Sequence, residues 1–300
     1  MLKLIIFQLT LYLSHTYTTA QPKFISRVCQ DTFGNYTANS PFKKNLDTLL
    51  STIVSNTNID YGFYNFSVGT NLDIVNGIGL CSPELPVHDC RSCLSNAARA
   101  IVHSCPNQKD AIGWYDSCMI RYSNRYIFHK LEFGPWYKVH YPILRSIDKG
   151  LYNKTASTLL TKLQARAAFG NSLRKFAADK ANVTSDFTVY AIVQCTPDLE
   201  SFDCYSCLGH AIATYYQQEG QQARLFFTSC NIRLFHDYML YDLSSLNSLL
   251  PQTQGKASKK WRVFVEILLP IIASLLILAA IFGCYFSRKR SKLKNRIKHM

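Results

Sequence analysis

A cysteine-containing segment that occurs twice is the feature that most restricts how this chain can fold. Residues 81–94 read CSPELPVHDCRSCL, and residues 195–208, which begin 114 positions later, read CTPDLESFDCYSCL. A Ser-Cys-x-Ile-Arg motif follows each copy, at 117–121 and at 229–233. Self-similarity of this kind indicates repeated structural units. The sequence therefore predicts two tandem copies of one cysteine-containing module.

Each module is predicted to be α+β, with two helices packed against an antiparallel sheet. Apolar residues at helical spacing predict the helices, with Leu46, Leu49, Leu50, Ile53, Val54, Leu94, Ala97, Ala98 and Ile101 in the first copy and Leu159, Leu160, Leu163 and Ala167 in the second. Asp89 and Asp203 are expected to cap the helices that carry the C-x2-C motif. Runs rich in aromatic and β-branched residues predict strands, at 61–68, 114–122, 187–193 and 225–234.

The ends of the chain are predicted to serve export and membrane anchoring. A cation followed by the apolar run 4–13 is typical of a signal peptide, here over 1–20. Residues 263–286 are predicted to form a transmembrane helix, because their last twenty residues, 267–286, carry no charge. Seven Lys and Arg residues in the tail 287–300 indicate that this end is cytosolic. The expected protein is thus a disulfide-stapled α+β ectodomain with one membrane span.

The basic composition of the chain belongs to the regions that flank the predicted span. The net charge is +14, but residues 21–255 hold 21 Lys and Arg against 18 Asp and Glu. The exported part therefore lacks the basic surface that nucleic-acid binding requires. The cytosolic tail is expected to contact anionic lipid instead.

Cysteines and glycosylation motifs are the candidate modification sites. Ten of the eleven cysteines fall in the exported part, where an even count predicts disulfides and no free thiol; they are Cys29, Cys81, Cys90, Cys93, Cys105, Cys118, Cys195, Cys204, Cys207 and Cys230. Cys284, in the predicted span, is expected to face lipid, with palmitoylation as the alternative. A zinc site is the rival interpretation of paired C-x2-C motifs, but it needs reduced thiolates. Four exported sequons predict N-glycosylation, at Asn35, Asn65, Asn153 and Asn182.

The cysteine motifs resemble those of the ginkbilobin-homologous, or stress-antifungal, module of plants. Residues 114–124, WYDSCMIRYSN, are similar to the first such module of cysteine-rich receptor-like kinases, and residues 190–199, YAIVQCTPDL, to the second. The resemblance covers nearly all of 24–245 and implies a plant source. We expect a first module at 21–133, a linker at 134–152, a second module at 153–245 and a juxtamembrane segment at 246–262.

Spacing alone leaves fifteen ways to pair six cysteines, and the resemblance implies one of them. It pairs Cys29 with Cys105, Cys81 with Cys90, and Cys93 with Cys118. The second module lacks equivalents of Cys29 and Cys105, as though one bridge had been lost whole. We therefore expect bridges Cys195–Cys204 and Cys207–Cys230. Because each bridge contributes about 2 to 4 kcal/mol, the second module is expected to be the less stable one.

Ginkbilobin itself binds mannose through an Asn, an Arg and a Glu. The resemblance places Gln30, Ile112 and Ser123 at these positions of the first module. In the second module only Arg224 matches, and Phe235 stands where the Glu would be. We therefore expect no mannose binding of this kind, and Arg224 is expected to be a solvated strand residue.

Catalysis has little support in the sequence. Bridged cysteines cannot act as nucleophiles, and a kinase domain, which follows the span in the receptor kinases that the chain resembles, is not expected in the short tail. We expect a non-catalytic, single-pass plasma-membrane protein of plant defence or stress signalling, without a cofactor, whose partner is an extracellular ligand or receptor protein. The layout also resembles plasmodesmata-located proteins, which regulate cell-to-cell transport. A mannose-binding antifungal protein is the third alternative.

Overall fold

The computed structural model describes residues 22–58, 61–140, 147–170, 174–217 and 223–236. The predicted signal peptide, juxtamembrane segment, transmembrane helix and cytosolic tail lie outside these residues. Among these described residues, no helix is both long enough and apolar enough to cross a membrane. All described residues belong to one compact unit, Met1–Pro251.

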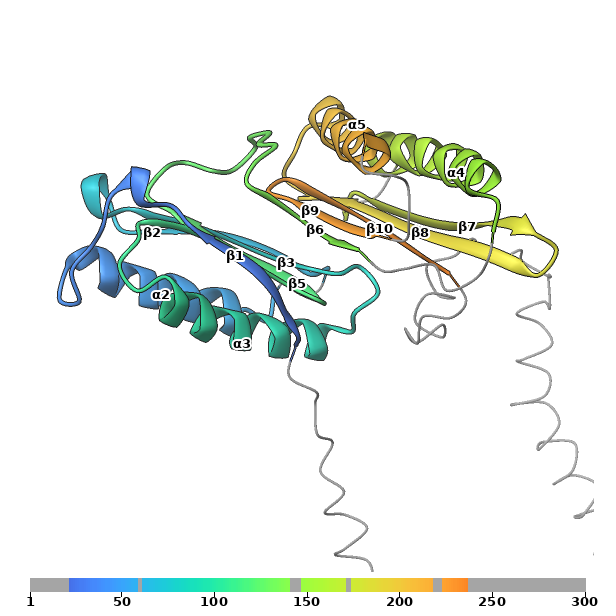
Figure 1. Ribbon diagram of the computed structural model, residues 1–300. Coiled ribbons are helices and arrows are strands. Elements are labelled where there is room, and N and C mark those ends of the chain that lie inside the picture. Colours follow the sequence, from blue (N-terminus) through green and yellow to red (C-terminus); the bar gives the residue numbers. More distant parts are fainter. Residues whose placement is uncertain (1–21, 59–60, 141–146, 171–173, 218–222, 237–300) are drawn as a thin grey trace, which may run out of the picture. The chain divides into compact units, whose positions relative to one another are not determined.

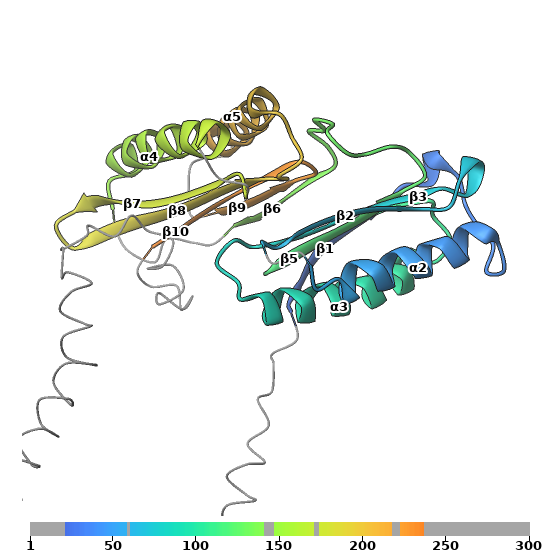
Figure 2. The same ribbon diagram turned by 180° about the vertical axis from the view of Figure 1, so that it is seen from behind.

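The first module is a five-stranded antiparallel sheet with two helices against one face (Figures 1 and 2). Its strands lie in the order β1-β4-β5-β3-β2. In chain order the elements are β1 (Phe24–Cys29), a 3-10 helix (Asp31–Phe33), α2 (Pro41–Ser55), β2 (Phe63–Val68), a second 3-10 helix (Asn71–Asp73), β3 (Val75–Cys81), α3 (Val87–Ser104), β4 (Asp110–Tyr115) and β5 (Cys118–Ser123).

The second module repeats this topology, which confirms the predicted pair of α+β modules. Its five strands lie in the order β6-β9-β10-β8-β7, so each strand has a counterpart in the first sheet. Its elements are β6 (Trp136–His140), α4 (Lys149–Phe169), β7 (Phe176–Thr184), β8 (Phe187–Cys195), α5 (Ser201–Gln217), β9 (Ala223–Phe227) and β10 (Cys230–His236). The helices again lie side by side on one face of the sheet (Figure 1).

The structure corrects the expected linker at 134–152. Trp136–His140 forms strand β6, which pairs with β9 at the edge of the second sheet, and α4 begins at Lys149. An edge strand is half-solvated, so its side chains need not alternate between apolar and polar. The five residues of β6 are all exposed or half-buried, which is why the pattern did not indicate a strand.

Two predicted strands are each a pair of strands joined by a tight turn. The run 114–122 contains the end of β4 and most of β5, and the run 225–234 contains β9 and β10 in the same way. Apolar residues continue on both sides of each turn, because all four strands are buried. Hydrophobicity alone therefore could not locate the reversals of the chain.

The predicted capping role of Asp89 and Asp203 is also wrong. Helix α3 begins at Val87, after Pro86, and no side chain caps its first turn. Asp89 lies within that first turn, as Asp203 does in α5. A carboxylate there still stabilises the helix, because it faces the positive end of the macrodipole.

Helix α2 begins after Ser40, whose hydroxyl caps it by accepting a hydrogen bond from the Lys43 amide at 3.3 Å.

Close packing of α2 on the sheet depends on two glycines of β3. A Cβ atom at Gly77 would lie 2.5 Å from Leu49, and one at Gly79 would lie 2.9 Å from Ile53. A larger residue at either position would force the Leu49 or Ile53 side chain to move in a closely packed interface.

Five disulfides link these elements, and they are the pairs that the family pattern implied: Cys29–Cys105, Cys81–Cys90, Cys93–Cys118, Cys195–Cys204 and Cys207–Cys230. Both C-x2-C motifs are fully bridged, so their sulfurs are not zinc ligands. Cys29 on β1 pairs in register with Ala111 on β4. The equivalent of Ala111 in the second module is Ala223, and its partner on β6 is His140. The second module thus carries a histidine where the first has the additional bridge.

Candidate functional site

An apolar cluster on the helix-free side of the first sheet includes a residue of the second module. The first module contributes eight buried side chains and β9 contributes Phe226; the eight are Phe63, Ile78, Leu80, Ile112, Trp114, Met119, Ile127 and Phe128. The first sheet is therefore buried on both faces. We call this contact between the two modules the joint.

A buried ion pair crosses the joint. Nη1 of Arg233, on β10, lies 2.5 Å from a carboxylate oxygen of Glu84, and Nη2 donates to the Ser82 hydroxyl at 3.0 Å. Burial alone would raise the pKa of Glu84, but the charge of Arg233 and hydrogen bonds outweigh it and hold that pKa below its ordinary value. Glu84 is therefore ionised at neutral pH, and the pair is complete.

Two more side chains of the second module donate to backbone carbonyls of the first. Gln194 donates to the Cys81 carbonyl at 3.0 Å, and Arg224 donates to the Asp116 carbonyl at 2.6 Å. Arg224 is only 4% exposed and lies over the Phe226 ring. The expectation of a solvated strand residue was wrong, because the first module covers this strand.

The segment that connects the modules is bonded to both of them. Arg121, the counterpart of Arg233 in the repeat, forms an ion pair with Glu132 at 2.5 Å. The Glu132 amide in turn donates to the Ser229 hydroxyl at 3.0 Å, and the His129 amide donates to Asp198 at 2.9 Å. The Arg of each Ser-Cys-x-Ile-Arg motif thus forms a buried ion pair. These ion pairs were not predicted from the sequence, although the repetition of the arginine was visible in the motif.

The positions expected for a mannose site are occupied by internal contacts. The Gln30 amide and the Ser123 hydroxyl both donate to the buried carboxylate of Asp110, at 3.2 and 2.6 Å. Ile112 lies within the apolar cluster of the joint. Phe235 is stacked on Tyr190. The structure therefore directs these side chains into the protein rather than toward a sugar.

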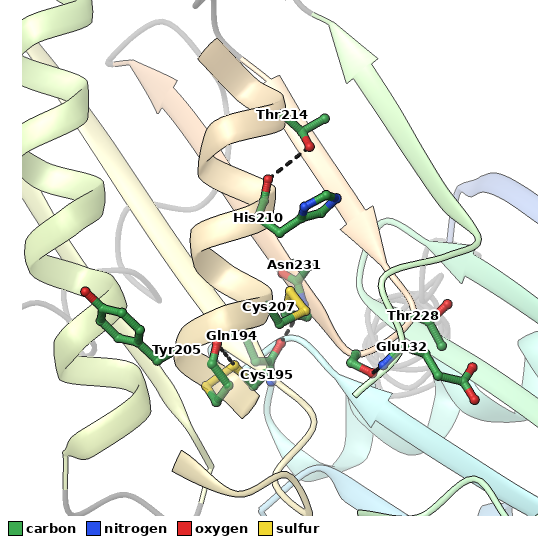
Figure 3. Close-up of a disulfide and its surroundings, with 12 residues drawn as sticks. Glu132, Gln194, Cys195, Tyr205, Cys207, His210, Thr214, Thr228 and Asn231 are labelled. Carbon is green, nitrogen blue, oxygen red and sulfur yellow. Dashed lines mark hydrogen bonds between the residues drawn. A yellow bond between two sulfur atoms is a disulfide. The ribbon is translucent and has the colours of Figure 1, made fainter. Parts of the chain in front are cut away.

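Aromatic side chains gather at the β6 edge of the second sheet, on the side that its helices cover. Phe133 and Trp136 are 40% and 42% exposed. The Phe133 ring lies 4.7 Å from the His210 ring of α5, and Trp136 stacks on the buried Phe227. Figure 3 shows His210 beside Thr214 on one side of α5, near the Cys207 disulfide. We call Phe133, Trp136 and His210 the aromatic patch.

The four predicted glycosylation sites differ in accessibility. Asn35 and Asn182 are exposed, whereas Asn65 on β2 and Asn153 on α4 are half-buried. The Asn182 side chain accepts a hydrogen bond from Thr188 at 2.9 Å. Glycosylation itself stays a prediction at all four.

Comparison with known protein families shows the family to which the chain belongs. Two stretches, 28–125 and 145–237, match the model of the family described as salt stress response/antifungal. The chain belongs to this family. Each match corresponds to one of the modules described above.

Several curated proteins of Arabidopsis thaliana are similar to the chain. Cysteine-rich receptor-like protein kinase 26 is 37% identical over 195 residues, which are 65% of this chain and 29% of the kinase. Cysteine-rich repeat secretory protein 38 is 33% identical over 215 residues, 70% of this chain and 83% of that protein. The chain spans less than half the length of the receptor-like kinases it matches.

Solved structures within the family share the fold. The tandem DUF26 ectodomain of the A. thaliana cysteine-rich receptor-like protein PDLP8 matches with a TM-score of 0.60 at 24% identity, over 72% of this chain and 98% of that one. The ectodomain of PDLP5 matches with a TM-score of 0.57 at 22% identity, over 71% and 98%. The tandem arrangement of two modules is thus common to these ectodomains.

Proposed function

We propose that this chain is a non-catalytic recognition protein of the cell surface in plant defence or stress responses. The aromatic patch is the observation that supports this proposal most strongly. Its three side chains come from the connecting segment, from β6 and from α5, and together they form one exposed surface. Exposed aromatic residues at the centre of a contact surface dominate binding energy. A partner protein that docks there would bind at the place where the connecting segment meets the second module.

The buried contacts of the joint support this role. Arg233 and Glu84 bind across it with little exposure, at 7% and 13% of their side chains. A preorganised surface loses less conformational entropy on binding than one that must first be assembled. The joint therefore lets the two modules act as one recognition unit.

The family relatives are named as receptor-like kinases and as a secretory protein, which is consistent with an extracellular or membrane-associated location. We propose that the exported part of this chain supplies recognition and that a partner supplies any phosphoryl transfer. A cytosolic tail rich in cations would lie against anionic lipid. Binding energy would then come mainly from the extracellular side.

A plasmodesmal role in cell-to-cell transport is the alternative, and the fold likeness to PDLP8 and PDLP5 does not separate it from the first proposal. A mannose-binding antifungal role has less support, since Gln30 and Ser123 bond to Asp110. The location of the protein in the plant cell separates the two leading candidates.

Proximity labelling with the full chain in plant epidermal cells tests the proposal. The wild type is compared with F133A/W136A and with F202A, a matched control that removes an aromatic ring exposed by 77% elsewhere on the second module. We expect surface receptor proteins to be labelled by the wild type and F202A and lost with F133A/W136A. Equal labelling by all three, kinase activity of the purified chain, or a cytosolic location would contradict the proposal. Confinement to plasmodesmata would favour the alternative.

A further inference from the structure

A groove of about 450 Å³ lies between α2 and α3 of the first module. Its apolar lining comes from Leu50 and Val54 on one helix and from Ala98 and Val102 on the other. Three serines and two charged residues complete the lining: Ser51, Ser55, Ser95, Asp47 and Arg99. This combination of an apolar surface with a few polar groups is typical of small-ligand sites, which enclose about 300 to 1,000 Å³.

The equivalent place in the second module is filled by larger side chains. In the repeat, Val54, Ala98 and Val102 correspond to Gln164, Ile212 and Tyr216. Gln164 is buried and donates to the Tyr205 carbonyl of α5 at 2.8 Å, and Tyr216 packs against the core. Helix packing thus does not require an open groove in this fold. The groove results from small residues at three positions of the first module.

A glycine makes the filled arrangement possible. Gly209 of α5 corresponds to Ser95, and a Cβ atom there would lie 2.8 Å from Nε2 of Gln164. A side chain at position 209 would therefore force the Gln164 amide to move from its present place. In the first module Ser95 and Val54 leave this crossing open.

Charge indicates which polar group a ligand would carry. Asp47 is paired with Lys43 at 2.5 Å, so its charge is already compensated. Arg99 donates to the neutral oxygens of Ser95 and Asn96, at 3.3 and 2.5 Å. The guanidinium of Arg99 is the cation of the lining, and it suits a carboxylate.

We propose that this groove binds a small amphipathic carboxylate. Its apolar body would lie on Leu50, Val54, Ala98 and Val102, and its carboxylate would accept hydrogen bonds from Arg99. A sugar fits this lining poorly, because no aromatic ring is present on which a sugar face could stack. The inference stands independently of the proposed function, which rests on a different surface.

Titration of the purified full chain in detergent-free nanodiscs with decanoate tests the proposal. Decyltrimethylammonium, which has the same chain length and the opposite charge, is the matched probe, and calorimetry gives both dissociation constants. We expect decanoate to bind at least tenfold more tightly than the cation after subtraction of binding to empty nanodiscs. Absence of decanoate binding, or equal binding of the two probes, would overturn the proposal.

Three variants locate the binding. R99A should weaken decanoate binding at least tenfold, because it removes the cation of the groove. V54Q/A98I/V102Y, which copies the second module, should abolish it, and K154A, which removes an exposed cation of α4, should leave it unchanged. Circular dichroism checks that each variant is folded, and R99A keeps the test decisive if the triple variant is not. Binding that survives R99A, or that K154A weakens equally, would also overturn the proposal.

Discussion

The two modules share one topology but stabilise it differently. The first adds the bridge Cys29–Cys105 between β1 and the end of α3, and it leaves a groove between its helices. The second has His140 at the position of Cys29; Gln164 links its two helices, and Tyr216 packs against the core. The first module thus has one more covalent link and a more open helix pair than the second. The additional bridge joins β1 to the end of α3 and does not involve α2, so it does not replace side-chain packing between the helices.

Removal of the additional bridge should have the largest effect. C29A/C105A opens a link across 76 residues, for which loop-closure entropy predicts a loss of about 4.5 kcal/mol. C195A/C204A opens a link across 9 residues and should cost about 2.6 kcal/mol. Hydrogen exchange of the full chain, followed by mass spectrometry, measures the local free energy of opening in each module.

Hydrogen exchange of the wild-type chain also tests whether the second module is the less stable of the two. We expect α5 and β6 to exchange before α3 and β1, because the second module lacks one bridge. Alkylation of the denatured, unreduced protein should label Cys284 alone. Greater protection of the second module, or labelling of any exported cysteine, would contradict the account of how the modules differ.

Breaking the ion pair of the joint should have the next largest effect. E84A leaves the Arg233 guanidinium buried without its carboxylate, at a cost of about 3 kcal/mol. E84Q, which preserves shape, isolates the charge. Urea unfolding of the full chain measures the free energy of each variant.

The pH dependence of this pair has a definite sign. The pKa of Glu84 is lower in the folded protein than its ordinary value of about 4.3. The stabilisation is therefore complete above that value and is lost as pH falls through the lower folded pKa. E84Q should remove this part of the acid destabilisation. An unchanged acid profile would show that Glu84 does not contribute to the joint.

The sequence predicted the modules much better than the joint. The repeated cysteine motif and the helical spacing of Leu46, Leu49 and Ile53 reveal the fold, because they reflect contacts inside one module. Arg224 and Phe226 look like ordinary strand residues, since their partners lie in the other module, about a hundred positions away. Contacts between repeats leave no periodic signal in either copy.

The groove shows a further limit of sequence reasoning. Val54 and Gln164 occupy equivalent positions and both fit a helix, so the pattern does not distinguish an open groove from a filled one. The difference appears only when the partner positions on the second helix, Ala98 and Ile212, are considered together. Cavities depend on the summed volume of facing side chains rather than on the polarity of any one of them.

Exchange of the groove residues should have an intermediate and asymmetric effect. I212A/Y216V removes packing between α4 and α5 and should cost about 2 to 4 kcal/mol. A98I/V102Y, the reverse change, adds side chains to an open groove and should cost less than about 1 kcal/mol. Thermal unfolding of both variants checks the asymmetry. Equal losses would mean that the first module has no usable space between its helices.

Glycan removal should have the smallest effect on stability. It also compares the exposed sequons of the two modules with the half-buried ones. Asn35 of the first module and Asn182 of the second are exposed, so an oligosaccharide can be attached without displacing packed side chains. Asn65 and Asn153 are half-buried, and we expect lower occupancy there. In the full chain expressed in plant cells, N35Q and N182Q should each lower the mass by one glycan and change the free energy of unfolding by less than about 0.5 kcal/mol. Intact mass before and after enzymatic deglycosylation gives the occupancy. Full occupancy at Asn153 with none at Asn182 would show that exposure in the folded module does not govern modification.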